Sequence, residues 1–401
     1  MKYKSMQLAG VFVCLTMVGG AVASAQSYTI TDLGSLNPTG INAWAQVVGN
    51  KNNQAYLWTK WNGATNLGLL PGGTFSMAAS INDLGAVVGT ADGTGTETYP
   101  DFQTQCTDLT QPFVWTQATG MKGLGTHNWG SQGYYPCFIP EFATANNALG
   151  QIVGYNGAFV TYQFGFAWSN NNWTVLGPFG DPPDSGNAVS NTGQIVGQVG
   201  FDDCTGCSPG HATSWTNGAA VDLGTLGGTD PEYTYGSSAN GVNDLGQIVG
   251  WSGTAPNAFY GGTFHAVLWP KNGAIQDLGT LPGDTLSTAL KINFFGQAIG
   301  TSGSTMIYTL YDALMNPCCS LGVSGRPFIW TEQRGMQDLN TLIRANSGWV
   351  LNSVSDINIW GQIVGSGTYK GQTHGFLLTP RVINIAKVRH VFGEPKTALE
   401  R

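Results

Sequence analysis

The sequence predicts an all-β protein, and three features lead to this prediction. Only 10% of the residues are charged, and the chain is rich in glycine (58), tryptophan (13) and tyrosine (14). This balance favours short strands joined by tight turns over solvent-exposed helices. The third feature is a nine-residue segment, VNDLGQIVG at 242–250, of which six further, looser copies occur along the chain.

The seven copies can be aligned on the glycine that closes each of them. They are Ile41–Gly49, Ile81–Gly89, Ala145–Gly154, Val189–Gly197, Val242–Gly250, Ile292–Gly300 and Ile357–Gly365. Their closing glycines are 40 to 65 residues apart. A loose period of about 50 residues is typical of solenoids, propellers and repeat arrays.

Each copy opens a unit in which we expect four strands. The first ends in Ile-Asn, the second holds Gln-Ile-Val-Gly, the third ends in an apolar run closed by tryptophan, and the fourth holds Asp-Leu-Gly. The third-strand runs are Tyr56–Trp58, Phe113–Trp115, Phe166–Trp168, Thr213–Trp215, Val267–Trp269, Phe328–Trp330 and, without tryptophan, Phe376–Leu378.

The Asn-Asp-Leu-Gly segment between the first two strands is predicted to be a tight hairpin turn. Asparagine and aspartate bond their own backbone, and glycine adopts the positive φ that such a turn requires. The repeated asparagines are therefore interpreted as structural and not catalytic.

Strands such as Ala266–Trp269 are apolar without alternation, which indicates burial on both faces, as in stacked sheets. Seven four-stranded units of this kind predict a seven-bladed β-propeller. A linear array is the alternative, and it would leave two end sheets exposed.

The ends of the chain favour a closed ring. The seventh unit stops at Thr379-Pro380 without a fourth strand, whereas residues 28–34 form an orphan one. We expect this N-terminal strand to complete the last blade, with Val382–Ile385 as a competitor for the same place.

The first 25 residues have the pattern of a secretory signal peptide. Lys2 and Lys4 precede a mostly apolar stretch, and Ala23-Ser24-Ala25 ends in a small-x-small cleavage site. We expect cleavage after Ala25 and a secreted or periplasmic protein. Residues 26–380 then form a single propeller domain, followed by a basic tail at 381–401.

The net charge of −7 argues against a nucleic-acid partner. No later segment is apolar enough to cross a bilayer, so no transmembrane segment is expected. We also expect a monomer without a cofactor.

At this level of detail the chain resembles the HAF repeat of bacterial extracellular proteins. The resemblance is carried by His265–Trp269, by Asp277–Leu281 after it and by Val242–Gly250 before it, and it extends over residues 28–380. Histidine stands at 211, 265 and 374, whereas Gln54, Gln111, Phe164 and Arg326 replace it at the matching positions. The resemblance implies an exported protein of propeller-like build and brings no established activity.

The histidines at 211, 265 and 374 could suggest a metal site, since histidine is the commonest metal ligand. They occupy the same place in different blades, however, so we expect them to be spread around the ring and to serve blade packing. No metal site is predicted.

Six cysteines remain after the signal peptide, namely Cys106, Cys137, Cys204, Cys207, Cys318 and Cys319. An even count in an exported chain predicts disulfides. We favour pairing of 106 with 137 and of 204 with 207. Cys318 and Cys319 then form a strained vicinal bridge or pair with the 204/207 loop, and a zinc site built from both pairs is the alternative.

The extra residues of the longer units are expected to emerge from a single face. These insertions are 90–111, 126–141, 198–210, 251–263 and 301–326. They hold every cysteine after the leader and many aromatic residues. We single out as candidate ligand-binding aromatics Trp129, Tyr134, Tyr135, Phe138, Phe201, Trp251 and Tyr260.

Elaborated loops on a rigid scaffold commonly carry function, and exposed aromatic residues suit sugar or protein surfaces. The leading hypothesis is a non-enzymatic scaffold that binds a surface glycan or protein through this face. The first alternative is a polysaccharide hydrolase or lyase with Asp92, Asp101, Glu141 or Asp230 in the axial funnel. The second is a structural envelope protein without a ligand.

Overall fold

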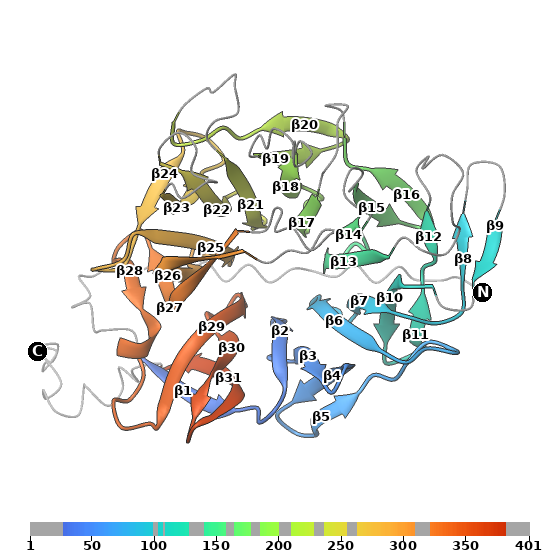
Figure 1. Ribbon diagram of the computed structural model, residues 1–401, viewed down its shortest axis with the longest axis horizontal. Coiled ribbons are helices and arrows are strands. Elements are labelled where there is room, and N and C mark those ends of the chain that lie inside the picture. The colour runs from blue at the N-terminus through green and yellow to red at the C-terminus, as the bar shows by residue number, and fades with distance from the viewer. Residues whose placement is uncertain are drawn as a thin grey trace, which may run out of the picture.

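The computed structural model describes residues 27–98, 103–106, 109–127, 140–157, 164–177, 185–199, 210–227, 236–254, 263–308 and 321–381. Seven four-stranded antiparallel sheets are arranged around a central axis (Figure 1). The predicted seven-bladed β-propeller is confirmed. Residues 1–26, residues 382–401 and six of the seven cysteines lie outside the described residues.

The first three blades contain, from the axis outward, the following strands. They are β2 (Asn37–Ile41), β3 (Val47–Lys51), β4 (Gln54–Thr59) and β5 (Gly63–Asn66); β6 (Ser76–Ile81), β7 (Val87–Ala91), β10 (Gln111–Thr116) and β11 (Gly120–Gly123); and β13 (Glu141–Asn146), β14 (Ile152–Asn156), β15 (Gly165–Ser169) and β16 (Asn172–Val175).

Blades 4 to 7 repeat the arrangement. Their strands are β17 (Ser185–Val189), β18 (Ile195–Val199), β19 (His211–Thr216) and β20 (Ala219–Asp222); β21 (Ser237–Val242), β22 (Ile248–Gly253), β23 (Phe264–Trp269) and β24 (Gln276–Gly279); β25 (Leu286–Ile292), β26 (Ala298–Tyr308), β27 (Leu321–Thr331) and β28 (Gly335–Asp338); and β29 (Trp349–Ile357), β30 (Ile363–Tyr369), β31 (Gln372–Pro380) and β1 (Tyr28–Asp32). A 3₁₀ turn, η2 (Leu339–Thr341), follows β28.

The last blade joins the two ends of the chain, as predicted. Strand β1 pairs antiparallel with β31 from Tyr28 opposite Pro380 to Asp32 opposite Phe376. The side chain of Tyr28 is buried, and its backbone N–H donates to the carbonyl of Leu342 at 2.8 Å. The N-terminal strand therefore removes the free edge that β31 would otherwise present.

The closing glycine of each repeat is required by a close approach of two strands. A Cβ atom on Gly250 would lie 1.8 Å from the carbonyl oxygen of Ser238 on the neighbouring strand β21. The corresponding distance is between 1.7 and 2.3 Å at the other six positions, Gly49, Gly89, Gly154, Gly197, Gly300 and Gly365. Only glycine fits there, which explains why the residue recurs in every unit.

The core consists of layers between adjacent blades. One cluster joins Val249 and Leu278 of blade 5 to Ala289 and Phe328 of blade 6, all of them buried. Strand β22 is buried along its whole length. The third-strand run Ala266–Trp269 is likewise buried at every position, as expected for a strand covered by a sheet on either side, whereas the matching run Tyr56–Trp58 of blade 1 is only half-buried.

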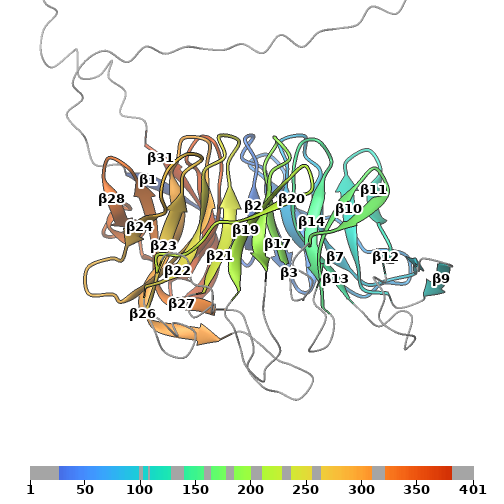
Figure 2. The same cartoon turned by 90° about the horizontal axis from the view of Figure 1, so that it is seen from above.

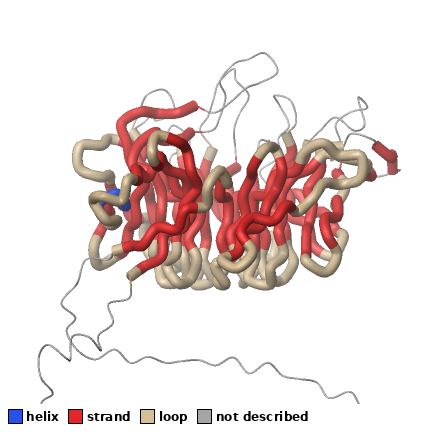
Figure 3. The backbone as a smooth tube through the Cα atoms, turned by 90° about the horizontal axis from the view of Figure 1, so that it is seen from below, coloured by secondary structure: helices blue, strands red, loops and turns tan. Residues whose placement is uncertain are grey.

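The two ends of the propeller differ. The turns between first and second strands and between third and fourth strands lie at one end, which we call the short-turn face; they appear as short tan turns along the lower edge in Figure 3. The opposite end, the loop face, carries the additional strands seen in Figure 2.

Part of the insertions forms strands, although we expected loops. β8 (Gly95–Thr98), β9 (Gln103–Cys106) and β12 (Thr126–His127) make a three-stranded sheet. β26 and β27 remain paired beyond the blade as far as Tyr308 opposite Leu321. These segments fall outside the repeat, so its period gave no signal for them. The described residues contain no helix with the length and apolarity needed to cross a bilayer.

Candidate functional site

The three histidines lie apart, each beside an aspartate of its own blade. His211 Nδ1 is 2.8 Å from Asp222, and His265 Nδ1 is 2.9 Å from Asp277. In the last blade His374 contacts Asp32. Within the described residues no group of three histidine, cysteine or acidic side chains is placed to hold a metal ion. The histidine position therefore links the third strand of a blade to its fourth.

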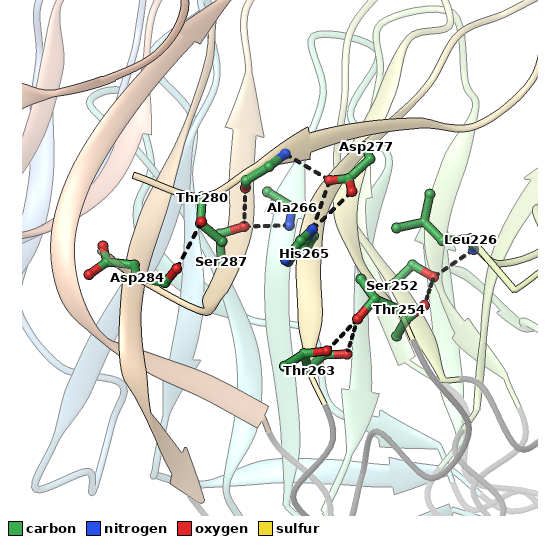
Figure 4. Close-up of polar contacts among 12 residues, drawn as sticks. Leu226, Ser252, Thr254, Thr263, His265, Ala266, Asp277, Thr280, Asp284 and Ser287 are labelled. Atoms are coloured by element: carbon green, nitrogen blue, oxygen red, sulfur yellow. Dashed lines mark hydrogen bonds and ion pairs between the residues drawn. The ribbon is translucent and has the colours of Figure 1, made fainter. Parts of the chain in front are cut away.

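The hydrogen bonds around His265 also connect its blade to the next blade (Figure 4). Asp277 accepts hydrogen bonds from His265 and from the backbone N–H of Gly279 at 2.7 Å. Ser287, on the first strand of blade 6, accepts from the N–H of Ala266 at 2.8 Å and donates to the carbonyl of Gly279 at 2.6 Å. The arrangement crosses the boundary between blades 5 and 6.

Electrostatics support this structural role. Burial raises the pKa of Asp277, but the hydrogen bonds from His265 and Gly279 and the attraction of His265 outweigh burial and leave that pKa below its usual value. The same causes lower the pKa of Asp222 beside His211. Both carboxylates are therefore held ionised as hydrogen-bond acceptors.

In two of the four blades where histidine is replaced, a different polar pair occupies the same place. Gln54 accepts a hydrogen bond from Asn66 of the fourth strand. Arg326 reaches Asp338 of its fourth strand at 3.4 Å and Asp284 at 2.9 Å. The polar side-chain link between third and fourth strands is thus kept in blades 1 and 6, whereas the Phe164 side chain of blade 3 cannot make it.

The repeated asparagine forms a chain of hydrogen bonds around the axis. In Asn243, Oδ1 accepts from the N–H groups of Leu245 and Gln247, and Nδ2 donates to Gln247 Oε1 and to the carbonyl of Asn293 in the next blade, at 2.8 to 3.1 Å. The same inter-blade bond is made by Asn42, Asn82, Asn147, Asn293 and Asn358. The structural interpretation of these asparagines is confirmed.

Blade 4 has Ser190 at the asparagine position, and a different contact spans this boundary. Asn191 donates from its backbone N–H and from Nδ2 to the carboxylate of Asp244, at 2.7 and 3.0 Å. The turns at the short-turn face are therefore tied to one another around the whole ring.

Two of the four acids proposed for an axial active site can be placed. Asp92 accepts from the N–H groups of Thr74 and Phe75 at 2.7 Å and from the Thr74 hydroxyl. Burial raises its pKa, and these bonds together lower it below the usual value. Glu141 is 1% exposed on β13. Asp101 and Asp230 lie outside the described residues.

Most residues expected to form a binding surface on the loop face also lie outside the described residues. These are Trp129, Tyr134, Tyr135, Phe138, Phe201 and Tyr260, together with Cys137, Cys204, Cys207, Cys318 and Cys319. Cys106 belongs to β9. The cysteine pairings and these aromatic residues stay predictions.

Trp251 corrects one expectation. It is only 5% exposed and packs against Phe264, with ring centroids 5.3 Å apart. Strand β22 continues to Gly253 in register with β23, so Trp251 lies inside a blade and not in a loop. Its ring belongs to the core.

A pocket of about 600 Å³ lies on the short-turn face where blades 5, 6 and 7 meet. Its apolar lining includes Phe295, Trp330 and Trp360. Phe295 and Trp360 are exposed, at 68% and 66%, whereas Trp330 is buried. Its polar lining residues are Gln247, Gln276, Gln297, Thr331, Glu332 and Gln333.

The network of turns holds the pocket in shape. Trp360 Nε1 donates to the carbonyl of Ala43 in blade 1 at 2.9 Å, which fixes the indole ring. The Oε1 atoms of Gln247 and Gln297 accept from Asn243 and Asn293 at 2.8 Å, so these two glutamines offer the pocket their NH₂ groups. The pocket therefore combines fixed aromatic surface with oriented donors.

Sequence reasoning did not find this pocket, because its walls come from the turns that were interpreted as purely structural. A signal was present: two of the repeated turns hold a pair of consecutive apolar residues, Phe294-Phe295 and Ile359-Trp360, between the asparagine and the glycine. A contiguous exposed apolar patch is typical of a binding site.

The architecture and this pocket define a β-propeller with a preformed pocket at one end. No protein-family model matches the chain, and no curated protein matches its sequence.

Solved structures resemble it at low identity. A chain from the crystal structure of a mitotic checkpoint complex is 11% identical, with 94% of this chain and 99% of that chain covered and a TM-score of 0.45. A gluconolactonase from Xanthomonas campestris is 9% identical, with 92% of this chain and 99% of that chain covered and a TM-score of 0.38. The β-propeller domain of a protease from Pyrococcus furiosus is 8% identical, with 79% of this chain and 98% of that chain covered and a TM-score of 0.34. Likenesses this distant say nothing about the chemistry of this chain.

Proposed function

We propose that the protein is an exported, non-catalytic propeller of the HAF-repeat type that binds a carbohydrate in the pocket between blades 5, 6 and 7. The observation that carries the proposal is the composition of the pocket, in which Phe295 and Trp360 stand beside four glutamines and Glu332. Export rests on the leader-like segment at 1–25 and on the repeat resemblance.

Carbohydrates suit such a lining. A pyranose ring presents a face of C–H groups, which packs against an aromatic ring, and a rim of hydroxyl groups, which pair with amides and carboxylates. The pocket volume of about 600 Å³ is within the range of small-molecule sites, which is about 300 to 1,000 Å³. One or two sugar residues fit this space.

The lining favours binding over turnover. Glycoside hydrolysis normally requires two carboxyl groups on either side of the scissile bond. Among the residues that line the pocket, Glu332 is the one carboxylate. The hydrolase or lyase hypothesis would need a second acid, and Asp92 and Glu141 are not part of this lining.

The loop face remains a separate candidate for a glycan or protein partner, and the experiment must distinguish the two faces. We expect a glycan array probed with the full chain to identify a ligand. Titration calorimetry with that ligand should then show at least tenfold weaker binding for Trp360→Ala and for Glu332→Gln.

Trp44→Ala is the matched control. Trp44 occupies the same turn position in blade 1, and its Nε1 donates to the carbonyl of Asp83 as that of Trp360 does to Ala43, yet it does not line the pocket. It should bind within twofold of the wild type. Binding that survives both pocket variants and is lost on trimming 128–139 or 309–320, which spares the blade strands, would place the ligand on the loop face.

A further inference from the structure

The innermost turns of the short-turn face expose a ring of large apolar residues. In six of the seven blades the residue two positions after the repeated asparagine, or its equivalent, is apolar and projects from the turn. These turn-tip residues are Trp44, Leu84, Leu149, Leu245, Phe295 and Trp360, and they are 46% to 77% exposed. The seventh tip is the exposed Thr192.

Nothing in the turn itself requires an apolar tip, although the two tryptophan tips also donate an indole hydrogen bond to the next turn. The tip contributes a backbone N–H, which donates to the asparagine Oδ1, as Leu84 does to Asn82 at 3.1 Å. Any residue other than proline supplies that donor, and Thr192 shows that a polar side chain is accepted. The three leucine tips, Leu84, Leu149 and Leu245, have neither an indole hydrogen bond nor a place in the pocket lining, so they point to a surface that the ring of tips enters.

The tips are held rigidly in one ring. The asparagine bonds tie each turn to the next, and the indole groups of Trp44 and Trp360 donate to carbonyls of the following turns at 2.9 Å. The turns reach a common level at this end of the molecule (Figure 3). A flat partner can thus meet all the tips at once.

The outer turns of the same face carry a basic rim. Lys60, Lys271 and Arg334 lie exposed in the turns between third and fourth strands, and Arg381 is exposed at the end of β31. The described outer turns of this face hold one carboxylate, that of Glu332. Beyond Arg381 the sequence adds four basic and two acidic residues.

The inner turns hold two further carboxylates, and both accept hydrogen bonds from a neighbouring turn. Asp83 accepts from the N–H of Ala43, and Asp244 accepts from Asn191. The chain as a whole has a net charge of −7. The described turns of the short-turn face thus hold four cationic and three anionic side chains, the cations in the outer turns, and the excess of acids lies elsewhere.

We infer that the short-turn face docks on an anionic lipid surface, with the apolar tips entering the headgroup layer and the basic rim contacting lipid phosphates. Peripheral membrane binding combines these two contributions, buried apolar area and attraction to anionic lipids. A second copy of the chain fits less well, because face-to-face association would oppose two basic rims. The inference does not depend on the carbohydrate pocket.

The test is flotation of residues 26–401, the chain expected after removal of the leader-like segment, with vesicles of phosphatidylcholine alone and of phosphatidylcholine mixed equally with phosphatidylglycerol. We expect binding to the anionic vesicles, at least tenfold weaker binding to the neutral ones, and loss of binding as salt is raised. The double variant Leu84→Ser with Leu149→Ser should bind anionic vesicles at least tenfold less well. Both positions lie outside the pocket lining, and circular dichroism with thermal unfolding checks that the variant is folded whether or not a glycan binds.

Two further variants sharpen the result. Thr192→Leu completes the ring and should tighten binding severalfold. Val350→Ser is the control, since Val350 is 58% exposed at the opposite end of the first strand of blade 7; it should bind like the wild type.

The inference is overturned by wild-type protein that floats with neither vesicle or by an equal loss in Val350→Ser. Light scattering could instead show a dimer that the double variant Leu84→Ser with Leu149→Ser converts to a monomer. That result would assign the face to a second copy of the chain. Loss of glycan binding in Glu332→Gln with unchanged flotation would separate the pocket from the lipid surface.

Discussion

His374 Nδ1 lies 2.8 Å from Asp32 Oδ1, although the two residues are 342 positions apart in the chain. The contact joins β31 to β1, so it fastens the N-terminal strand to the last blade. His374→Ala should lower the free energy of unfolding by about 1 kcal/mol, the usual loss for one hydrogen bond. Because β1 is an edge strand, its amides should also exchange with solvent faster.

Hydrogen exchange of Tyr28–Asp32 together with urea unfolding measures both effects. His265→Ala removes the equivalent contact inside a continuous blade and is the control. It should lower stability by a similar amount while β1 stays protected. Equal protection of β1 in both variants would contradict the role of His374 in closure.

The ring of asparagine bonds predicts opposite effects at two positions. Asn243→Ala removes four hydrogen bonds of a side chain that is 4% exposed and should cost about 3 kcal/mol, since buried partners are left unpaired. Ser190→Asn introduces the missing side chain and should stabilise by about 1 kcal/mol. Thermal and urea unfolding check both, and a destabilised Ser190→Asn would contradict the ring as a source of stability.

The closing glycine predicts a large loss from a minimal change. In Gly250→Ala the new Cβ would lie 1.8 Å from the Ser238 carbonyl oxygen, so β21 and β22 must separate. We expect destabilisation of more than about 3 kcal/mol, comparable with overpacking or breaking a buried network. Gly218→Ala, at a turn glycine with open space around it but φ of 79°, should cost about 1 kcal/mol, the backbone term alone. Similar losses at both glycines would be inconsistent with a steric requirement at Gly250.

The paired aspartates predict a loss of stability in acid. Asp222 and Asp277 have folded-state pKa values below their ordinary value of 3.8. Their contribution is therefore fully present above that value and is lost as the pH falls through the folded-state pKa. The free energy of unfolding should fall below about pH 4.

Asp356 acts in the opposite direction. Burial raises its pKa, an effect that Lys291 and the N–H groups of Ile41 and Ile357 only partly offset. Protonation thus favours the folded state as the pH falls toward 3.8, and Asp356→Asn should remove this gain. Urea unfolding between about pH 3 and pH 7 measures both the loss of stability from the paired aspartates and the gain from protonation of Asp356. If the free energy of unfolding falls in acid by the same amount in Asp277→Asn as in the wild type, the loss cannot be attributed to the paired aspartates.

Much of the architecture could be predicted because the constraints on it are local and repeated. Asn243 bonds its own turn, Gly246 takes φ of 79°, and Gly250 meets the next strand, and each of these requirements recurs about once per blade. Closure by β1 followed from the orphan strand at one end and the incomplete unit at the other. The strands within insertions 90–111 and 301–326 were missed because they occur once.

The candidate site was predicted less well, for a different reason. Trp251 looked like a loop aromatic, but the ladder between β22 and β23 continues past the repeat and buries it. Phe295 and Trp360 were assigned to structural turns, although tertiary packing brings them together at one pocket. A residue's place within a unit does not reveal its neighbours in the adjacent units.

The sequence by itself determined the number of blades, their four strands and the hairpin at each inner turn, because these follow from backbone geometry within about 50 residues. The surface that the turns form together depends on the closed ring, which only the tertiary structure shows. Closure sets Trp44 beside Trp360 and carries six apolar tips and a basic rim to one end of the molecule. Such a surface depends on distances between blades, which are fixed by the packing of one sheet on the next and by the joining of the chain's two ends.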